Sequence, residues 1–233
     1  MAEKRLPLIA HLEELKSRLI KSIISILITS VLAYSFVEEI IRNLAEPVGR
    51  LVFIAPAEAF LANIKVALFC GIFLSSPLII YQMWQFIKSG LKRREERLVL
   101  LFAPFSFLLF TLGGLFGYFI IVPIGIKFLL GFATDIVRPM ITIDRYISFL
   151  GILTLAFGII FQLPLISLFL TKLGVIGPRF LSSKRREAII GIFILAAILT
   201  PPDVVTQCLM AVPLLALYEI SIIFSKIVYK KAP

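Results

Sequence analysis

The 233-residue chain is 60% hydrophobic and 16% charged, with a mean hydropathy of +1.02 and a formal net charge of +10. A soluble domain is excluded, because so few polar residues cannot cover its surface. One histidine and two cysteines are too few for a zinc site or a haem, and the sequence has no glycine-rich phosphate loop. We therefore expect no cofactor, although a carboxylate-bound ion is not excluded.

Six apolar runs follow one another along the chain, separated by short charged loops, and each predicts a transmembrane helix. The chain is interpreted as an all-α integral membrane protein with one domain, 1–233. This domain would comprise a cytoplasmic segment 1–21, a six-span bundle 22–225 and a cytoplasmic tail 226–233. The apolar runs are residues 22–37, 61–87, 98–122, 147–170, 188–199 and 204–225.

Lysines and arginines are concentrated on every second loop. The two termini and the 88–97 and 172–187 loops hold 18 of them, whereas the loops on the other side hold 5. Because positive residues stay on the cytoplasmic side, both termini are predicted to be cytoplasmic and the protein to lie in the cytoplasmic, or inner, membrane. Anionic lipid near these loops accounts for the net charge, so we expect lipid contacts and no nucleic-acid partner.

The segment before the first span has helical periodicity, with apolar residues on one side and His11, Glu14 and Arg18 on the other. This pattern predicts an amphipathic helix at the cytoplasmic interface that runs into the first span. Glu14 and Arg18 are four residues apart, which favours an ordinary surface ion pair worth about 0.3–0.5 kcal/mol. The apolar residues are Leu8, Ile9, Leu12, Leu15 and Leu19.

The 88–97 loop places two carboxylates, Glu95 and Glu96, among five basic residues. Charge balance at the start of a helix is the ordinary explanation, since acidic residues also suit the helix dipole there. A functional role for the two carboxylates is the alternative.

The fourth run contains a polar residue, Gln162, inside the expected hydrocarbon region. An amide there needs a partner, so Gln162 either makes a structural hydrogen bond between helices or serves the function. Pro164 removes a backbone hydrogen bond and is expected to kink this span. In the third run, Gly113 and Gly117 are spaced for close helix packing.

The last two runs are predicted to form short spans five and six. Residues 188–199 would rise only about 18 Å as a helix, against about 30 Å of hydrocarbon. The turn at Pro201, Pro202 and Asp203 would then stop below the outer surface, where it thins the bilayer or faces a polar recess. Asp203 can also simply cap the helix that follows.

Several motifs stand in order along nearly the whole chain: His11-Leu-Glu-Glu14-Leu-Lys-Ser-Arg18, Pro47 in Ala-Glu-Pro-Val, Ser76-Pro77-Leu-Ile-Ile-Tyr81-Gln-Met-Trp84-Gln-Phe86, Glu95 in the basic loop, Tyr118-Phe-Ile-Ile-Val-Pro123, Phe161-Gln-Leu-Pro164 and Leu199-Thr-Pro-Pro-Asp203. Together they strongly resemble the TatC family, the multispanning receptors of the twin-arginine protein translocase. The family topology agrees with six spans and cytoplasmic ends.

The resemblance implies a concave, glove-shaped bundle that is not an enzyme. Such a bundle would bind twin-arginine signal peptides of folded precursors and assemble with the single-span proteins TatA and TatB, and with copies of itself. Transport would be driven by the proton-motive force, without a nucleotide.

The resemblance also implies roles for particular residues. Glu14 and Glu95 would recognise the paired arginines, with Phe86 close by and Arg18 and Glu96 as further members of the site. Two carboxylates suit two guanidinium groups, because bidentate pairing favours arginine over lysine. Structural or partner-contact roles fall to Pro47, Pro77, Tyr118, Pro201, Pro202 and Asp203.

The chain departs from the family at Gln162, where a glutamate is common. An amide can donate and accept hydrogen bonds but cannot titrate or pair with a cation. A charge-dependent role at this position is therefore in doubt for this chain.

Two other classes of protein fit the sequence less well. A small-molecule secondary transporter would favour an inverted repeat with paired broken helices, and the sequence shows no such repeat. An intramembrane enzyme would need a nucleophile, a base or a metal set within the spans, which two cysteines and one histidine do not supply.

Overall fold

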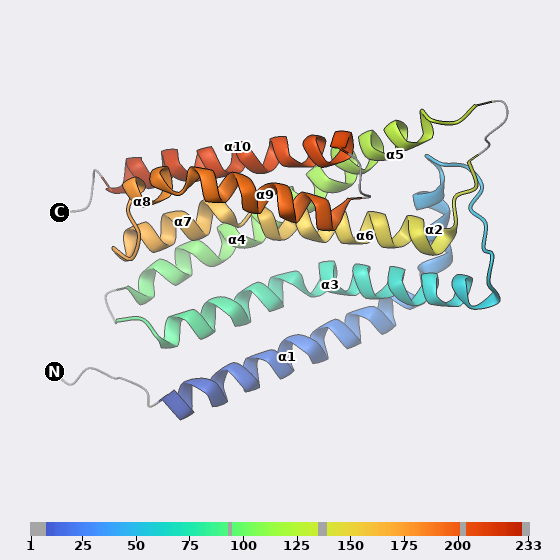
Figure 1. Ribbon diagram of the computed structural model, residues 1–233. Coiled ribbons are helices and arrows are strands. Elements are labelled where there is room, and N and C mark those ends of the chain that lie inside the picture. The colour runs from blue at the N-terminus through green and yellow to red at the C-terminus, as the bar shows by residue number, and fades with distance from the viewer. Residues whose placement is uncertain (1–7, 93–94, 135–138, 201–203, 230–233) are drawn as a thin grey trace. The chain divides into compact units, whose positions relative to one another are not determined.

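The structure, a computed structural model, describes residues 8–92, 95–134, 139–200 and 204–229. Within these residues every regular element is a helix, and the only β-type pairing is an isolated bridge between Val52 and Thr142. The chain forms two compact units (Figure 1). The first comprises residues 1–107 and 140–148, and the second comprises 108–139 and 149–233.

The first unit is built around two long antiparallel helices, α1 (Leu8–Tyr34) and α3 (Pro56–Ser89). They approach closely where Gly71 faces Ser30, since a Cβ on Gly71 would lie 2.8 Å from the Ser30 backbone nitrogen. At the same place the Thr29 hydroxyl donates a hydrogen bond to the Gly71 carbonyl, at 2.8 Å. Helix α1 is continuous, as the periodicity predicted, so the polar segment and the first span are one rod.

The connection between α1 and α3 contains a helix that the sequence pattern did not predict, α2 (Val37–Ala45). Its carbonyl at Leu44 accepts a 2.6 Å hydrogen bond from the Tyr146 hydroxyl. Further along, the Val52 carbonyl accepts a 2.8 Å hydrogen bond from the Ile143 N–H. These bonds tie the connection to the start of α6 (Ile143–Ile160).

The second unit takes most of its core from the last helices. Helix α10 (Val204–Tyr229) packs on α7 (Leu163–Lys172) and on α9 (Arg185–Leu199). A buried 2.8 Å hydrogen bond joins the hydroxyls of Thr171 and Ser225. The short helix α8 (Pro178–Ser183) is held to α10 by the Tyr218 hydroxyl, which donates to the Leu181 carbonyl.

The third span is longer than predicted. After α4 (Glu96–Phe116) comes a wide π turn, η1 (Gly117–Ile121), and then α5 (Val122–Leu130). The sequence pattern ended this span at residue 122, because Pro123 cannot donate a helical hydrogen bond and normally stops a helix. The π turn accommodates that missing bond, and the apolar helix runs on for eight residues.

The glycines of this helix pack against α6 and its end, as expected for Gly113 and Gly117. A Cβ on Gly113 would lie 2.8 Å from the Phe161 Cβ, and one on Gly117 would lie 3.1 Å from the Phe157 Cβ. Gly125 also lies close to α6, since a Cβ added there would lie 3.2 Å from the Phe149 ring. The prediction of close helix packing at Gly113 and Gly117 is confirmed.

The fourth span is broken, as Pro164 predicted. Helix α6 ends at Ile160, and α7 begins at Leu163 with Pro164 in its first turn. Phe161 and Gln162 form the turn between them. The first turn of a helix tolerates proline, because the backbone N–H groups of that turn have no helical acceptor and none is lost.

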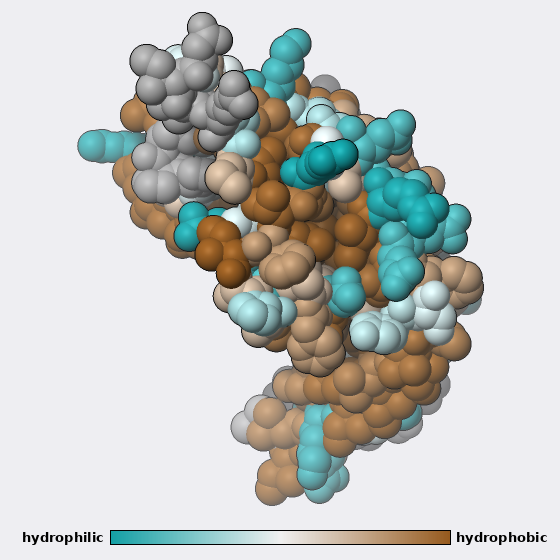
Figure 2. Space-filling view, turned by 90° about the vertical axis from the view of Figure 1, so that its right-hand side faces the viewer, coloured by the Kyte–Doolittle hydropathy of each residue, from teal (hydrophilic) through white to brown (hydrophobic). Residues whose placement is uncertain are grey.

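Five helical segments of the described chain are long and apolar enough to cross a membrane: Ile9–Tyr34, Pro56–Ser89, Glu96–Leu130, Ile143–Lys172 and Val204–Tyr229. They correspond to predicted spans one to four and six. Many large apolar side chains of these helices are exposed, as contact with lipid requires, and Figure 2 shows apolar residues from the end of the helices that lies at the right of Figure 1.

Predicted span five is α9, whose 15 residues rise about 22 Å and are short for a bilayer, as expected. The expectation that span six is also short is wrong, because α10 has 26 residues and rises about 39 Å. Helix α10 continues beyond the predicted apolar run, 204–225, to Tyr229.

Candidate functional site

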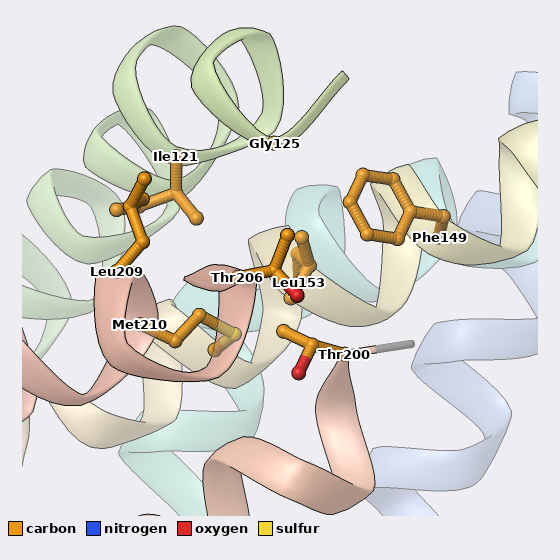
Figure 3. A pocket seen from close by; sticks show the side chains of 8 residues that line it. All are labelled: Ile121, Gly125, Phe149, Leu153, Thr200, Thr206, Leu209 and Met210. Carbon is orange, nitrogen blue, oxygen red and sulfur yellow. The ribbon is translucent and has the colours of Figure 1, made fainter. Parts of the chain in front are cut away.

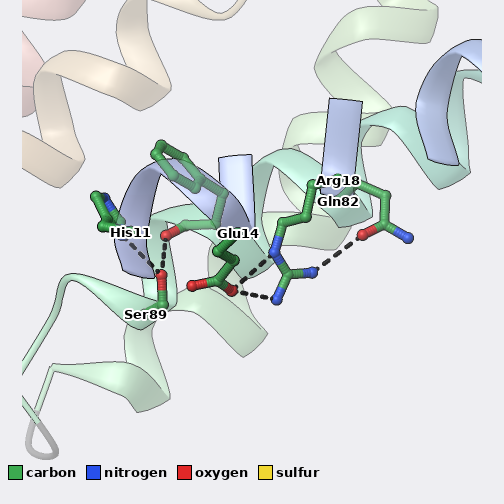
Figure 4. A network of polar contacts seen from close by, with 6 residues as sticks. His11, Glu14, Arg18, Gln82 and Ser89 are labelled. Atoms are coloured by element: carbon green, nitrogen blue, oxygen red, sulfur yellow. Dashed lines mark hydrogen bonds and ion pairs between the residues drawn. The ribbon is translucent and has the colours of Figure 1, made fainter. Parts of the chain in front are cut away.

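Polar side chains gather where α1 begins and α3 ends, and Figure 4 shows them facing one another across the two helices. We call this group the α1–α3 polar cluster. It consists of His11, Glu14, Arg18, Gln82, Phe86 and Ser89.

The cluster is centred on an ion pair between Glu14 and Arg18. Arg18 donates from Nε and Nη2 to the same carboxylate oxygen, Glu14 Oε1, at 2.9 and 2.6 Å. Its remaining nitrogen, Nη1, donates to Gln82 Oε1 at 3.0 Å. Both charged side chains are 22% exposed, so the predicted pair is present but is less exposed than a free surface pair. Arg18 therefore links α1 to α3.

The other half of the cluster surrounds His11. Its ring stacks on Phe86 with 4.4 Å between the ring centroids and 16° between the planes. His11 Nδ1 lies 3.4 Å from the Ser89 hydroxyl, which donates a 2.7 Å hydrogen bond to the Phe86 carbonyl. Phe86 thus lies beside the helix that carries Glu14.

The two loop carboxylates lie at the same end of α3. Glu95 accepts a 3.1 Å hydrogen bond from the backbone N–H of Lys92, and Glu96 lies 3.6 Å from the Lys88 ammonium. Local charge balance therefore describes Glu96 well. Glu95 and Glu14 accept hydrogen bonds from different partners, the Lys92 N–H and the Arg18 side chain.

The first unit contains a second ion pair that was not predicted from the sequence. Lys65, the lone cation of the second apolar run, donates to Asp144 Oδ1 at 2.6 Å and to the Ser148 hydroxyl at 2.8 Å. A charge inside a span signals a need for a partner. That partner is 79 residues away in the sequence, so no local pattern could identify it.

Gln162 is buried at the break between α6 and α7, with 9% of its surface exposed. Its neighbour Phe161 packs on Phe116 at a centroid distance of 5.4 Å. This burial agrees with the prediction of a polar side chain inside the bundle.

The remaining predicted residues lie apart from the polar cluster. Pro77 is exposed in the middle of α3, and Pro47 is exposed in the turn after α2. Tyr118 lies in η1 and meets Phe119 edge to face at 4.8 Å. Pro201, Pro202 and Asp203 lie outside the described residues.

A small hollow lies beside the start of α10 (Figure 3), within the second unit. Its polar groups come from Thr200 and Thr206, and the Thr200 hydroxyl already donates to the Ala196 carbonyl at 2.8 Å. Its lining residues are Ile121, Gly125, Phe149, Leu153, Thr200, Thr206, Leu209 and Met210.

Long apolar helices with few buried polar groups define a multi-pass α-helical membrane protein. A sequence model of the family described as Sec-independent protein translocase protein (TatC) matches residues 10–213. This chain belongs to the TatC family. The family is one of protein translocase subunits and not of enzymes.

Similar proteins agree over nearly their whole length. The chain is 43% identical to the Sec-independent protein translocase protein TatC of Carboxydothermus hydrogenoformans, over 99% of this chain and 97% of that protein. It is also 43% identical to TatC of Aquifex aeolicus, over 97% of each chain. A crystal structure described as twin arginine translocase receptor TatC superposes with a TM-score of 0.86 at 43% identity, covering 94% of this chain and 99% of that one.

Proposed function

We propose that this protein is the receptor and core subunit of a twin-arginine translocase. It binds the twin-arginine signal peptides of folded precursors and, with TatA-type and TatB-type partners, supports their export by the proton-motive force. The observation that carries this proposal is the half-buried Glu14 carboxylate at one end of the α1–α3 pair, in a chain of the TatC family.

Two carboxylates supply the chemistry of recognition. Glu14 and Glu95 each have two oxygens, and a guanidinium can bind a carboxylate through two parallel hydrogen bonds, which an ammonium cannot do. Phe86 adds an aromatic surface beside Glu14, and Glu96 adds a further negative charge near Glu95. This arrangement favours a pair of arginines over a pair of lysines.

The charge distribution supports an orientation for this site. Lysines and arginines are 18 to 5 in favour of the side that holds both termini and the 88–97 loop. By the positive-inside rule that side is the cytoplasm, and the membrane is the cytoplasmic membrane. The α1–α3 polar cluster would then face the compartment in which precursors fold.

Peptide binding to the purified protein in detergent tests the recognition site. Glu14→Ala and Glu95→Ala should each weaken binding of a twin-arginine peptide by about 1–3 kcal/mol, because a charged pair is lost in a partly screened site. Glu13→Ala is the matched control, since Glu13 is an exposed acidic neighbour on the same helix. A double Glu14→Ala, Glu95→Ala variant that binds as tightly as the parent would refute the assignment.

We place contacts with a single-span partner on residues 188–225, which include most of α9 and α10. A 15-residue helix leaves the bilayer thin beside it, so a partner helix displaces little lipid there. Inserting four leucines after Ile198 should preserve membrane insertion but impair transport. Normal transport by this variant, or partner crosslinks confined to α1 and α4, would contradict the placement.

Gln162 serves as a buried polar contact of the bundle in this proposal. Gln162→Leu should fold but perturb transport or partner assembly, whereas Gln162→Glu should be accepted, since it restores the residue common in the family. Unchanged transport by Gln162→Leu would show that the residue at this position serves only to fill space in the bundle.

A further inference from the structure

The carboxylate that the proposed function assigns to a ligand arginine already holds an arginine of its own chain. Arg18 makes two hydrogen bonds to Glu14 Oε1, at 2.9 and 2.6 Å, and so occupies one of the two oxygens that a parallel contact with a signal-peptide guanidinium would use. We infer that Arg18 is an intramolecular competitor, which occupies Glu14 in the free receptor and must release it before a signal-peptide arginine can bind. This inference rests on the proposed function.

The geometry permits such an exchange without a change of fold. Glu14 and Arg18 are four residues apart on one continuous helix, so rotation of the Arg18 side chain separates them while the backbone stays in place. Both side chains retain 22% of their exposure, so the pair can be reached from outside.

Gln82 gives the displaced arginine a second acceptor. Arg18 Nη1 already donates to Gln82 Oε1 at 3.0 Å, from α3, while Nε and Nη2 donate to Glu14. When Glu14 turns to a ligand, Arg18 can keep the Gln82 bond, so its guanidinium is not left without a protein partner. Gln82 therefore lowers the cost of opening the pair, since an unpaired half-buried charge is costly.

Competition of this kind has a quantitative signature. Only the fraction of receptors with Glu14 released can bind, and the apparent dissociation constant rises by the inverse of that fraction. The factor belongs to the free receptor, so it is the same for every peptide that uses Glu14. A half-buried local pair of this strength corresponds to about a two- to threefold loss of affinity.

The test measures binding of twin-arginine and twin-lysine peptides to detergent-purified protein. Arg18→Gln should tighten both by one common factor of about two to three. Lys16→Gln is the matched control, because Lys16 is exposed on the same helix and removes the same charge without touching Glu14. Equal gains in Arg18→Gln and Lys16→Gln, or weaker binding by Arg18→Gln, would overturn the inference.

A second variant separates diversion of Arg18 from an added charge. Gln82→Glu offers Arg18 another carboxylate and should tighten peptide binding in the parent more than in the Arg18→Gln background. The same gain in both backgrounds would show that Arg18 is not involved and would overturn the inference. Glu14→Ala keeps the outcomes distinct. If this change leaves peptide affinity unaltered, the proposed function is refuted. If peptide binding needs Glu14 but does not tighten in Arg18→Gln, only the competition by Arg18 is refuted.

Discussion

The first unit contains two ion pairs with the same 2.6 Å separation but different places in the chain. Glu14 and Arg18 are four residues apart on α1, whereas Lys65 and Asp144 are 79 residues apart and join α3 to the first turn of α6. Opening the first pair moves only side chains. Opening the second removes a tie between two helices, at side chains that are 36% and 28% exposed. The local pair is suited to exchange with a ligand, and the distant pair to holding the fold.

The largest expected effect comes from breaking the distant pair on one side. Lys65→Met should destabilise the protein by about 1 kcal/mol, because Asp144 loses its partner on α3 at a site where both side chains are partly exposed. Thermal unfolding in detergent measures this loss. Lys127→Met is the control, since Lys127 is exposed on α5. If the control loses as much stability, Lys65 has no special role.

Removing both charges of the distant pair should cost less than removing one. In Lys65→Met, Asp144→Leu no unpaired charge remains, so we expect at least half of the lost stability to return. The same unfolding measurement on the single and double variants gives the coupling between the two sites. Additive losses would show that the two residues act independently. The Lys65–Asp144 pair would then have no structural role as a pair.

The smallest expected effect is on the local pair. Glu14→Gln should change the free energy of unfolding by no more than about 0.5 kcal/mol, the range of a helix pair four residues apart. Peptide affinity, in contrast, should fall clearly. If Glu14→Gln destabilised the protein as much as Lys65→Met does, the division into a binding pair and a structural pair would fail.

The same contrast explains what the sequence could predict about the site. The Glu14–Arg18 spacing is a local signal, and the pair forms. Gln82 and the Lys65–Asp144 pair depend on contacts between segments distant in the sequence, so no spacing rule could find them. A lone lysine in an apolar run is a sign that a partner exists, but it does not identify Asp144, and the pair was not predicted.

The fold followed a similar rule. Long apolar runs predicted the spans, and Pro164 predicted the break before α7. Helix α2 was missed because its nine residues are amphipathic and not continuously apolar. The third span was cut short at Pro123, because a proline normally ends a helix and the π turn that accommodates it has no clear sequence signal.

The π turn also sets the rotational register of everything that follows it. Gly117 and Gly125 are eight residues apart, which in a regular α-helix is about 80° past two full turns. A π turn absorbs about one extra residue, or about 100° of rotation, so both glycines come to face α6, at Phe157 and Phe149. Deleting a single residue from η1 would therefore act as a twist of α5, and would carry Gly125 away from the Phe149 ring, which lies 3.2 Å from where its Cβ would be.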